Sequence, residues 1–187
     1  MNSLFRLFRR KRDCRDFGRR VGRELLKAAH VMAPRIAGAS KRNIGDDDAF
    51  TALAVLAKFS FEMIAETRGL TIAQGAVLFR GVSEIIDPAI GEALHVALTE
   101  AGALCVRAGR TIQTGLLLNV NREDDPRILA TKLLESLDSK WRSASVPDEV
   151  VLLFDHFFRG ATKATNQALS GVSFREPQSL VEEVLLR

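Results

Sequence analysis

The fold is decided by the stretch DDDAFTALAVLAKFSFEMIAET, residues 46–67. Apolar residues occur on almost every side of a helix drawn through it, namely Phe50, Leu53, Leu56, Ala57, Phe61 and Ile64, with Val55, Phe59 and Met63 on the adjoining faces. A helix that is apolar all round belongs in the interior of a protein. Asp46 to Asp48 supply a cap and favourable negative charge at its start, and Gly69 stands where a left-handed C-terminal cap is wanted. We therefore expect this helix to be the centre of a bundle.

Helical spacing continues on both sides of this stretch, while strand signals are nearly absent. The expected helices cover residues 16–33, ended or kinked by Pro34, then 71–86, 88–108 or on to 118, 126–141, 147–171 and a short terminal segment, 177–186. Asp87-Pro88 and Asp125-Pro126 are interpreted as helix starts, because proline fits the first turn. The sequence predicts an all-α, single-domain bundle of six to seven helices with a basic N-terminal arm.

Charge is divided unevenly along the chain. Residues 1–42 hold 13 Lys or Arg and 3 Asp or Glu, whereas residues 43–187 hold 14 and 20. We therefore divide the chain into a basic amphipathic arm (1–15), the bundle domain (16–171) and a tail with a short helix (172–187). A basic arm on a mildly acidic body indicates an anionic partner, or docking on an acidic protein face.

The arm also carries apolar side chains at helical spacing. If Ser3 caps a helix, Leu4, Phe5, Leu7 and Phe8 share one side and Arg6, Arg9 and Arg10 the other. This is the arrangement of a helix that lies on anionic lipid. Further cations extend the positive field, and the candidate membrane-binding or anion-binding residues include them: Lys11, Arg12, Arg15, Arg19, Arg20 and Arg23.

These features favour a non-enzymatic helical interaction or adaptor protein, attached peripherally to an anionic membrane surface by its N-terminus. We expect it in the cytoplasm, at the inner membrane face, with a protein partner or a second copy of itself. The first alternative is a nucleic-acid-associated protein that binds phosphates through its arginines. The second is a small-molecule-binding protein or enzyme with a pocket between helices, which a polar-lined cavity containing Glu62, Glu66, Glu92 or His95 would favour.

No catalytic constellation is recognised, and no cofactor is predicted. The weak candidates for a metal site are Glu92 and His95, because Glu-x-x-His places a carboxylate and an imidazole one helical turn apart. Di-iron bundles need a second such pair, which neither His30 nor His156 supplies. We therefore predict no metal site. Cys14, among arginines, is expected to be an exposed and inert thiol, and Cys105 a small core residue.

Small residues on the helix faces predict close helix packing, chiefly Gly75, Gly91, Gly102 and the alanines around them. Self-association is a second expectation, since the apolar circumference of the 48–67 helix is large for one chain to cover.

Overall fold

The computed structural model describes residues 11–41, 43–68, 70, 72–118, 126–138 and 145–170, with the side chains of residues 11–13, 72 and 115–118 left out. These residues form helices and no strand: α2 (Lys11–Ala39), α3 (Asp46–Thr67), α4 (Ile72–Leu94), α5 (Leu98–Leu118), α6 (Pro126–Leu137) and α7 (Asp148–Leu169). The predicted all-α bundle is confirmed. Residues 1–10 and 171–187, which hold most of the expected arm and the expected terminal helix, lie outside the described residues.

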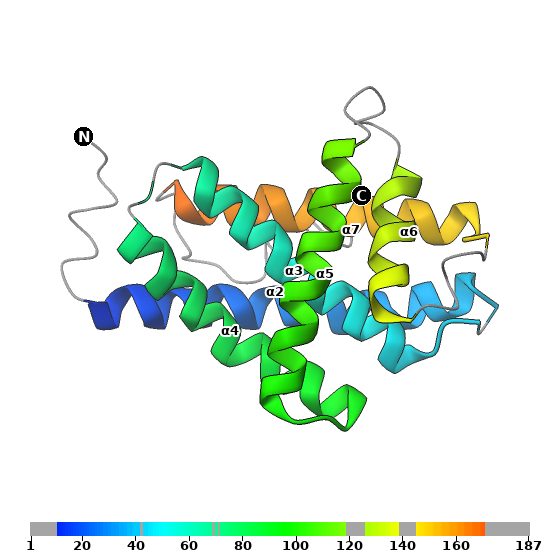
Figure 1. The fold of residues 1–187 in the computed structure, drawn as a ribbon, viewed down its shortest axis with the longest axis horizontal. Helices are drawn as coiled ribbons and strands as arrows, with labels where there is room; N and C mark the ends of the chain where they lie inside the picture. The colour runs from blue at the N-terminus through cyan, green and yellow to red at the C-terminus, as the bar shows by residue number, and fades with distance from the viewer. Residues whose placement is uncertain are drawn as a thin grey trace.

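Helix α3 is the centre of the bundle, as its sequence predicts. It contacts each of the other five helices, and every residue from Ala49 to Lys58 is buried. Helices α2 and α7 follow the long axis of the molecule, while α5 and α6 lie across it (Figure 1). Because helices of its own chain cover α3, its apolar circumference does not require a second copy, and the reason for expecting self-association is removed.

Helices α2 and α4 approach so closely that their backbones touch. A Cβ atom added at Gly18 would lie 2.2 Å from the carbonyl oxygen of Leu78, and one at Gly81 would lie 2.2 Å from that of Arg15. Only glycine fits where two backbones meet in this way. We call this contact, made by Gly18, Gly22 and Gly81, the glycine seam. Close helix packing is confirmed, but at other glycines than those predicted. A Cβ atom added at Gly75 would have nothing within 4 Å, and one at Gly102 would make only an ordinary contact.

The expected helix ends beside Pro34 and Pro88 are wrong, and so is the expected start of the first helix at residue 16. Helix α2 runs through Pro34 and begins by Lys11, and α4 runs through Pro88. The break falls later, at His95, whose φ of 55° is left-handed. There Val96 N–H donates to Gly91 O (2.9 Å) and His95 N–H to Glu92 O (3.3 Å), which is the pattern of a Schellman cap. Helix α5 then leaves at a bend of 104°, and Leu98 in its first turn is 58% exposed.

Helix α3 also starts differently from the prediction. Gly45 is the N-cap and no side chain caps it, so Asp46 to Asp48 contribute only negative charge in the first turn. Among the described helices, none alone is long and apolar enough to cross a membrane; only α4 and α5 taken together, across their bend, pass that test.

Candidate functional site

A cavity of about 420 Å³ lies between α3, α4 and α5. We call it the Lys58 cavity. Its apolar walls come from all three helices and its polar groups from α3 and α5; the lining consists of Val55, Lys58, Phe59, Glu62, Met63, Glu66, Phe79, Cys105, Val106, Gly109, Arg110 and Gln113. This volume and this mixture of apolar walls with a few polar groups are typical of sites for small organic molecules.

Lys58 is the unusual member of this lining, because its side chain is only 6% exposed. Its Nζ lies 2.5 Å from Oδ1 of Asp87 on α4 and 5.1 Å from the ring centre of Phe79. A buried ammonium requires a countercharge, which Asp87 provides, and an aromatic face adds further attraction. No other hydrogen bond from Lys58 to a described residue exists, although an ammonium has three donors. Because Lys58 also lines the cavity, a polar group bound there is a candidate partner for the remaining donors.

Cys105 joins the same group from α5. Its Sγ lies 3.7 Å from Asp87 Oδ1, so the thiol donates a weak hydrogen bond to the carboxylate that holds Lys58. Burial raises the pKa of the Cys105 thiol to about 12; the neighbouring Asp87 raises it too, and Lys58 opposes them. The thiol is therefore protonated at neutral pH. It acts as a polar donor and not as a nucleophile.

Two carboxylates stand at the outer part of the cavity, one turn apart on α3. Glu62 and Glu66 are both exposed and form no hydrogen bond or ion pair with a described residue. Partial burial raises the pKa of Glu62, and the negative charge of Glu66 adds to this, while Lys58 opposes it. The only described cation at this outer part is Arg110 of α5. Of the four residues proposed for a polar-lined cavity, Glu62 and Glu66 line the Lys58 cavity, whereas Glu92 and His95 do not.

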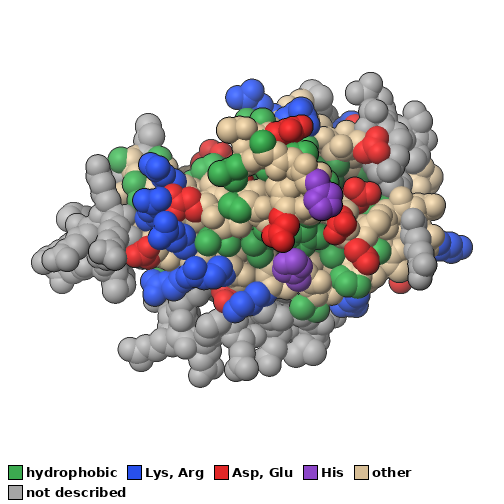
Figure 2. Space-filling model, turned by 90° about the horizontal axis from the view of Figure 1, so that it is seen from below, with side chains coloured by type: hydrophobic (Ala, Val, Ile, Leu, Met, Phe, Trp, Pro, Cys, Tyr) green, Lys and Arg blue, Asp and Glu red, His purple; other side chains and the backbone are tan. Residues whose placement is uncertain are grey.

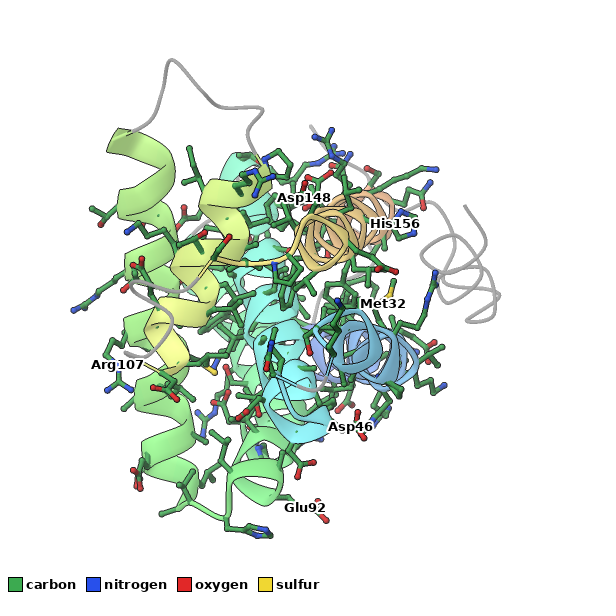
Figure 3. The ribbon with its side chains drawn as sticks, turned by 90° about the vertical axis from the view of Figure 1, so that its right-hand side faces the viewer. Met32, Asp46, Glu92, Arg107, Asp148 and His156 are labelled. Atoms are coloured by element: carbon green, nitrogen blue, oxygen red, sulfur yellow. The ribbon has the colours of Figure 1, made fainter. Side chains whose placement is uncertain are left out.

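Glu92 and His95 lie on a different, open groove with His30, Asp46 and Asp47. The helix ends between them, so their expected one-turn spacing on a continuous helix is not kept. His30 stacks on Phe50, with ring centres 4.2 Å apart. In Figure 3, Glu92 lies near the bottom of the view and His156 at its upper right, so the two do not face one another. Within the described part of the chain, no three His, Cys, Asp or Glu side chains are placed to hold a metal ion.

The candidate anion-binding residues of the arm fall into three groups: some are outside the described residues, some are ion-paired and some are exposed. Residues 4–10 are outside the described residues, as are the side chains of Lys11 and Arg12. Arg15 and Arg19 both bind Glu84 of α4, which neutralises part of their charge. Arg20 and Arg23 are exposed. Figure 2 shows Lys and Arg side chains gathered toward the start of α2 on this face.

The prediction that the Cys14 thiol is exposed is wrong. It is only 6% exposed, because α2 begins before it and turns it toward the core.

The Lys58–Asp87 pair was not predicted from the sequence, although the sequence contains a signal for it. Lys58 is the only charged residue between Asp48 and Glu62 in a helix that is apolar all round, so it had to be buried and had to find a carboxylate.

No protein-family model matches this chain, and neither the curated proteins nor the solved structures contain a significant match to it.

Proposed function

We propose that this protein is a non-enzymatic helical binding protein that takes a small amphipathic molecule into the Lys58 cavity. The observation that supports this most strongly is a buried lysine with unused donors on the wall of an otherwise largely apolar space. Burying an ammonium is costly, and a bound polar group offsets part of that cost. The protonated Cys105 and the ion-paired Lys58 are both poor nucleophiles, which favours binding over catalysis.

The test uses N-phenylnaphthylamine, a neutral apolar dye that becomes fluorescent in dry pockets. We expect saturable binding at one site. Gly109→Leu places a side chain in the cavity, because a Cβ there lies 3.7 Å from Phe59 Cδ2, and it should weaken binding at least tenfold. Thr114→Leu is the matched control, on the exposed side of the same helix and outside the cavity lining. Emission that never saturates, or equal affinity of the two variants, would show that the cavity is not a binding site.

A second candidate function is peripheral attachment to an anionic membrane surface through the N-terminal arm. It is favoured by Arg20 and Arg23, which are exposed on α2 in continuation of the arm. Each cation near an anionic bilayer contributes about 1 kcal/mol, so two of them change the bound fraction substantially.

Sedimentation with anionic and neutral vesicles tests this attachment on the full chain. We expect binding to anionic vesicles only, reduced roughly thirtyfold by Arg20→Gln with Arg23→Gln. Arg35→Gln with Lys41→Gln removes two exposed charges, one near the C-terminal end of α2 and one in the turn that follows it, and should have little effect. Phe5→Ser with Phe8→Ser tests the apolar side of the arm. Equal sedimentation with neutral vesicles would exclude the charge-based attachment, and salt-sensitive retention of nucleic acid instead would favour the phosphate-binding alternative.

A further inference from the structure

We propose that the ligand of the Lys58 cavity has two different ends: a neutral oxygen acceptor that reaches Lys58, and an amine that lies by Glu62 and Glu66. This inference rests on the proposed binding function and specifies its ligand class. Three features of the cavity support it, one for each end of the ligand and one for its middle.

The inner end is set by the Lys58–Asp87 pair. Asp87 already balances the charge of Lys58 at 2.5 Å, so the ammonium has hydrogen bonds left to donate but no charge left to neutralise. A ligand carboxylate placed there would add a second negative charge beside Asp87 in a buried environment, which is costly. A carbonyl, amide or hydroxyl oxygen accepts the hydrogen bond without that cost. The inner end therefore selects a neutral acceptor.

The outer end is set by the two glutamates of α3. Glu62 and Glu66 repel one another one turn apart, and α3 ends at Thr67, so its last carbonyl groups add negative potential close to Glu66. Arg110 contributes one positive charge against these two negative ones. A cation between the carboxylates relieves their repulsion, whereas an anion increases it. The outer end therefore selects an amine over a carboxylate.

The middle of the cavity is apolar. Phe59 and Met63 of α3, Phe79 of α4 and Val106 of α5 line it. The polar group at one extreme is 95% buried and the carboxylates at the other are exposed, so the cavity is polarised from inside to outside. A short hydrocarbon chain between the two ends matches this wall.

Four probes with a common octyl chain separate these requirements. They are N-octylacetamide, octylamine, and the octyl acetamide carrying either a terminal amine or a terminal carboxylate. Binding is measured by calorimetry and by displacement of N-phenylnaphthylamine. We expect the amine-terminated acetamide to bind at least tenfold more tightly than its carboxylate counterpart, and about tenfold more tightly than octylamine.

Matched variants assign each preference to its residues. Glu62→Gln with Glu66→Gln should reduce the amine preference to less than twofold, whereas Glu100→Gln with Glu149→Gln, which removes two exposed charges elsewhere, should leave it intact. Lys58→Met with Asp87→Leu, which leaves no unpaired buried charge, should abolish the advantage of the acetamide over octylamine.

The results distinguish a failure of the proposed binding function from a failure of the proposed ligand class. If no probe binds and the dye does not saturate, the proposed binding function is wrong. If the probes bind but the carboxylate form binds as tightly as the amine form, or the glutamate variants keep the preference, the cavity remains a binding site and the ligand class is overturned. Because the wild-type comparison alone can give that second result, it does not depend on how well any variant folds.

Discussion

Helix α4 meets its neighbours in two opposite ways. Along the glycine seam its backbone touches that of α2, and side chains are excluded from the contact. On its other side, toward α3 and α5, large side chains such as Phe79 hold the helices apart and leave the Lys58 cavity. The charged groups follow this difference. Beside the seam, Glu84 pairs with Arg15 and Arg19 where water still reaches, whereas Asp87, less than one turn further along, pairs with Lys58 in the interior.

The comparison shows how one helix supports both rigidity and open space. Close packing gains dispersion contacts and leaves no volume for a ligand, while separation by bulky side chains leaves volume at the cost of contacts. We infer that the seam holds α4 in place so that the cavity side can remain partly empty. The following predictions test this division, from the largest expected effect to the smallest.

Substitutions in the glycine seam should destabilise the protein more than substitutions on the cavity side of α4. Gly81→Ala puts a methyl group 2.2 Å from the Arg15 carbonyl oxygen, so α2 and α4 must separate, and we expect a loss of about 3 kcal/mol in the free energy of unfolding. Urea denaturation measures it. Gly75→Ala is the control in the same helix: it meets nothing within 4 Å and should stabilise by up to about 1 kcal/mol. Similar effects of the two substitutions would mean that the seam is not a tight contact.

Breaking the buried Lys58–Asp87 pair on the cavity side should cause the second-largest loss of stability. Lys58→Met leaves the Asp87 carboxylate without its countercharge and should cost about 2 kcal/mol, less than in a fully buried pair because Asp87 is 13% exposed. Adding Asp87→Leu should recover most of that loss. A double-mutant cycle by urea denaturation gives the coupling between the two residues. If the effects of the two substitutions simply add, the pair does not act as a unit.

At the corner between α4 and α5, a substitution should raise the free energy of unfolding instead of lowering it. His95 holds a φ of 55°, which a residue with a Cβ adopts at a cost, so His95→Gly should stabilise by about 1 kcal/mol. Thermal unfolding monitored by circular dichroism measures the shift. Glu92→Gly, inside the last turn of α4, should destabilise by about 1 kcal/mol and serves as the control. Destabilisation by His95→Gly would indicate that the imidazole has a role beyond the cap.

The ion pairs beside the seam should have the smallest effect at neutral pH. Hydrogen bonds from Arg15, and then from Arg19, lower the pKa of Glu84 from its usual 4.5 to about 2, against the opposing effect of desolvation. Because the folded-state pKa is below the unfolded one, the stabilisation is present above about pH 4.5 and is lost as the pH falls toward 2.

Glu84→Gln should therefore lower Tm by a few degrees at most at pH 7, since the pair is near the surface. The difference from the wild type should shrink between pH 4.5 and pH 2. A Glu84→Gln effect that persists at pH 2 would mean that the carboxylate charge is not its cause.

Most of the fold could be predicted from local patterns. The central position of α3 follows from its continuous apolar circumference, and α7 follows from Pro147 and the phenylalanine stripe behind it. The boundary at Pro88 could not be predicted in the same way. Proline fits the first turn of a helix and, with packing to compensate, also its interior, so the residue alone does not decide between them.

The candidate site was foreseen only in part. Glu62 and Glu66 are one turn apart on one helix, so their proximity is a property of the sequence. Lys58 and Asp87 are 29 residues apart, and their pairing depends on how α3 and α4 cross. The same holds for Gly18 and Gly81, which are recognised as a seam only once two helices face one another.

The sequence by itself determined that this chain is helical, that the helix over residues 46–67 is the centre of the bundle, and that cations are concentrated near the N-terminus. These are properties of neighbouring residues, because helical periodicity and charge are set within a few turns. Only the tertiary structure decided which glycines carry a backbone contact, which lysine is buried against which aspartate, and where a cavity remains. Such features require atoms from distant segments to meet within a few ångströms, and close packing decides them at a scale that no local pattern encodes.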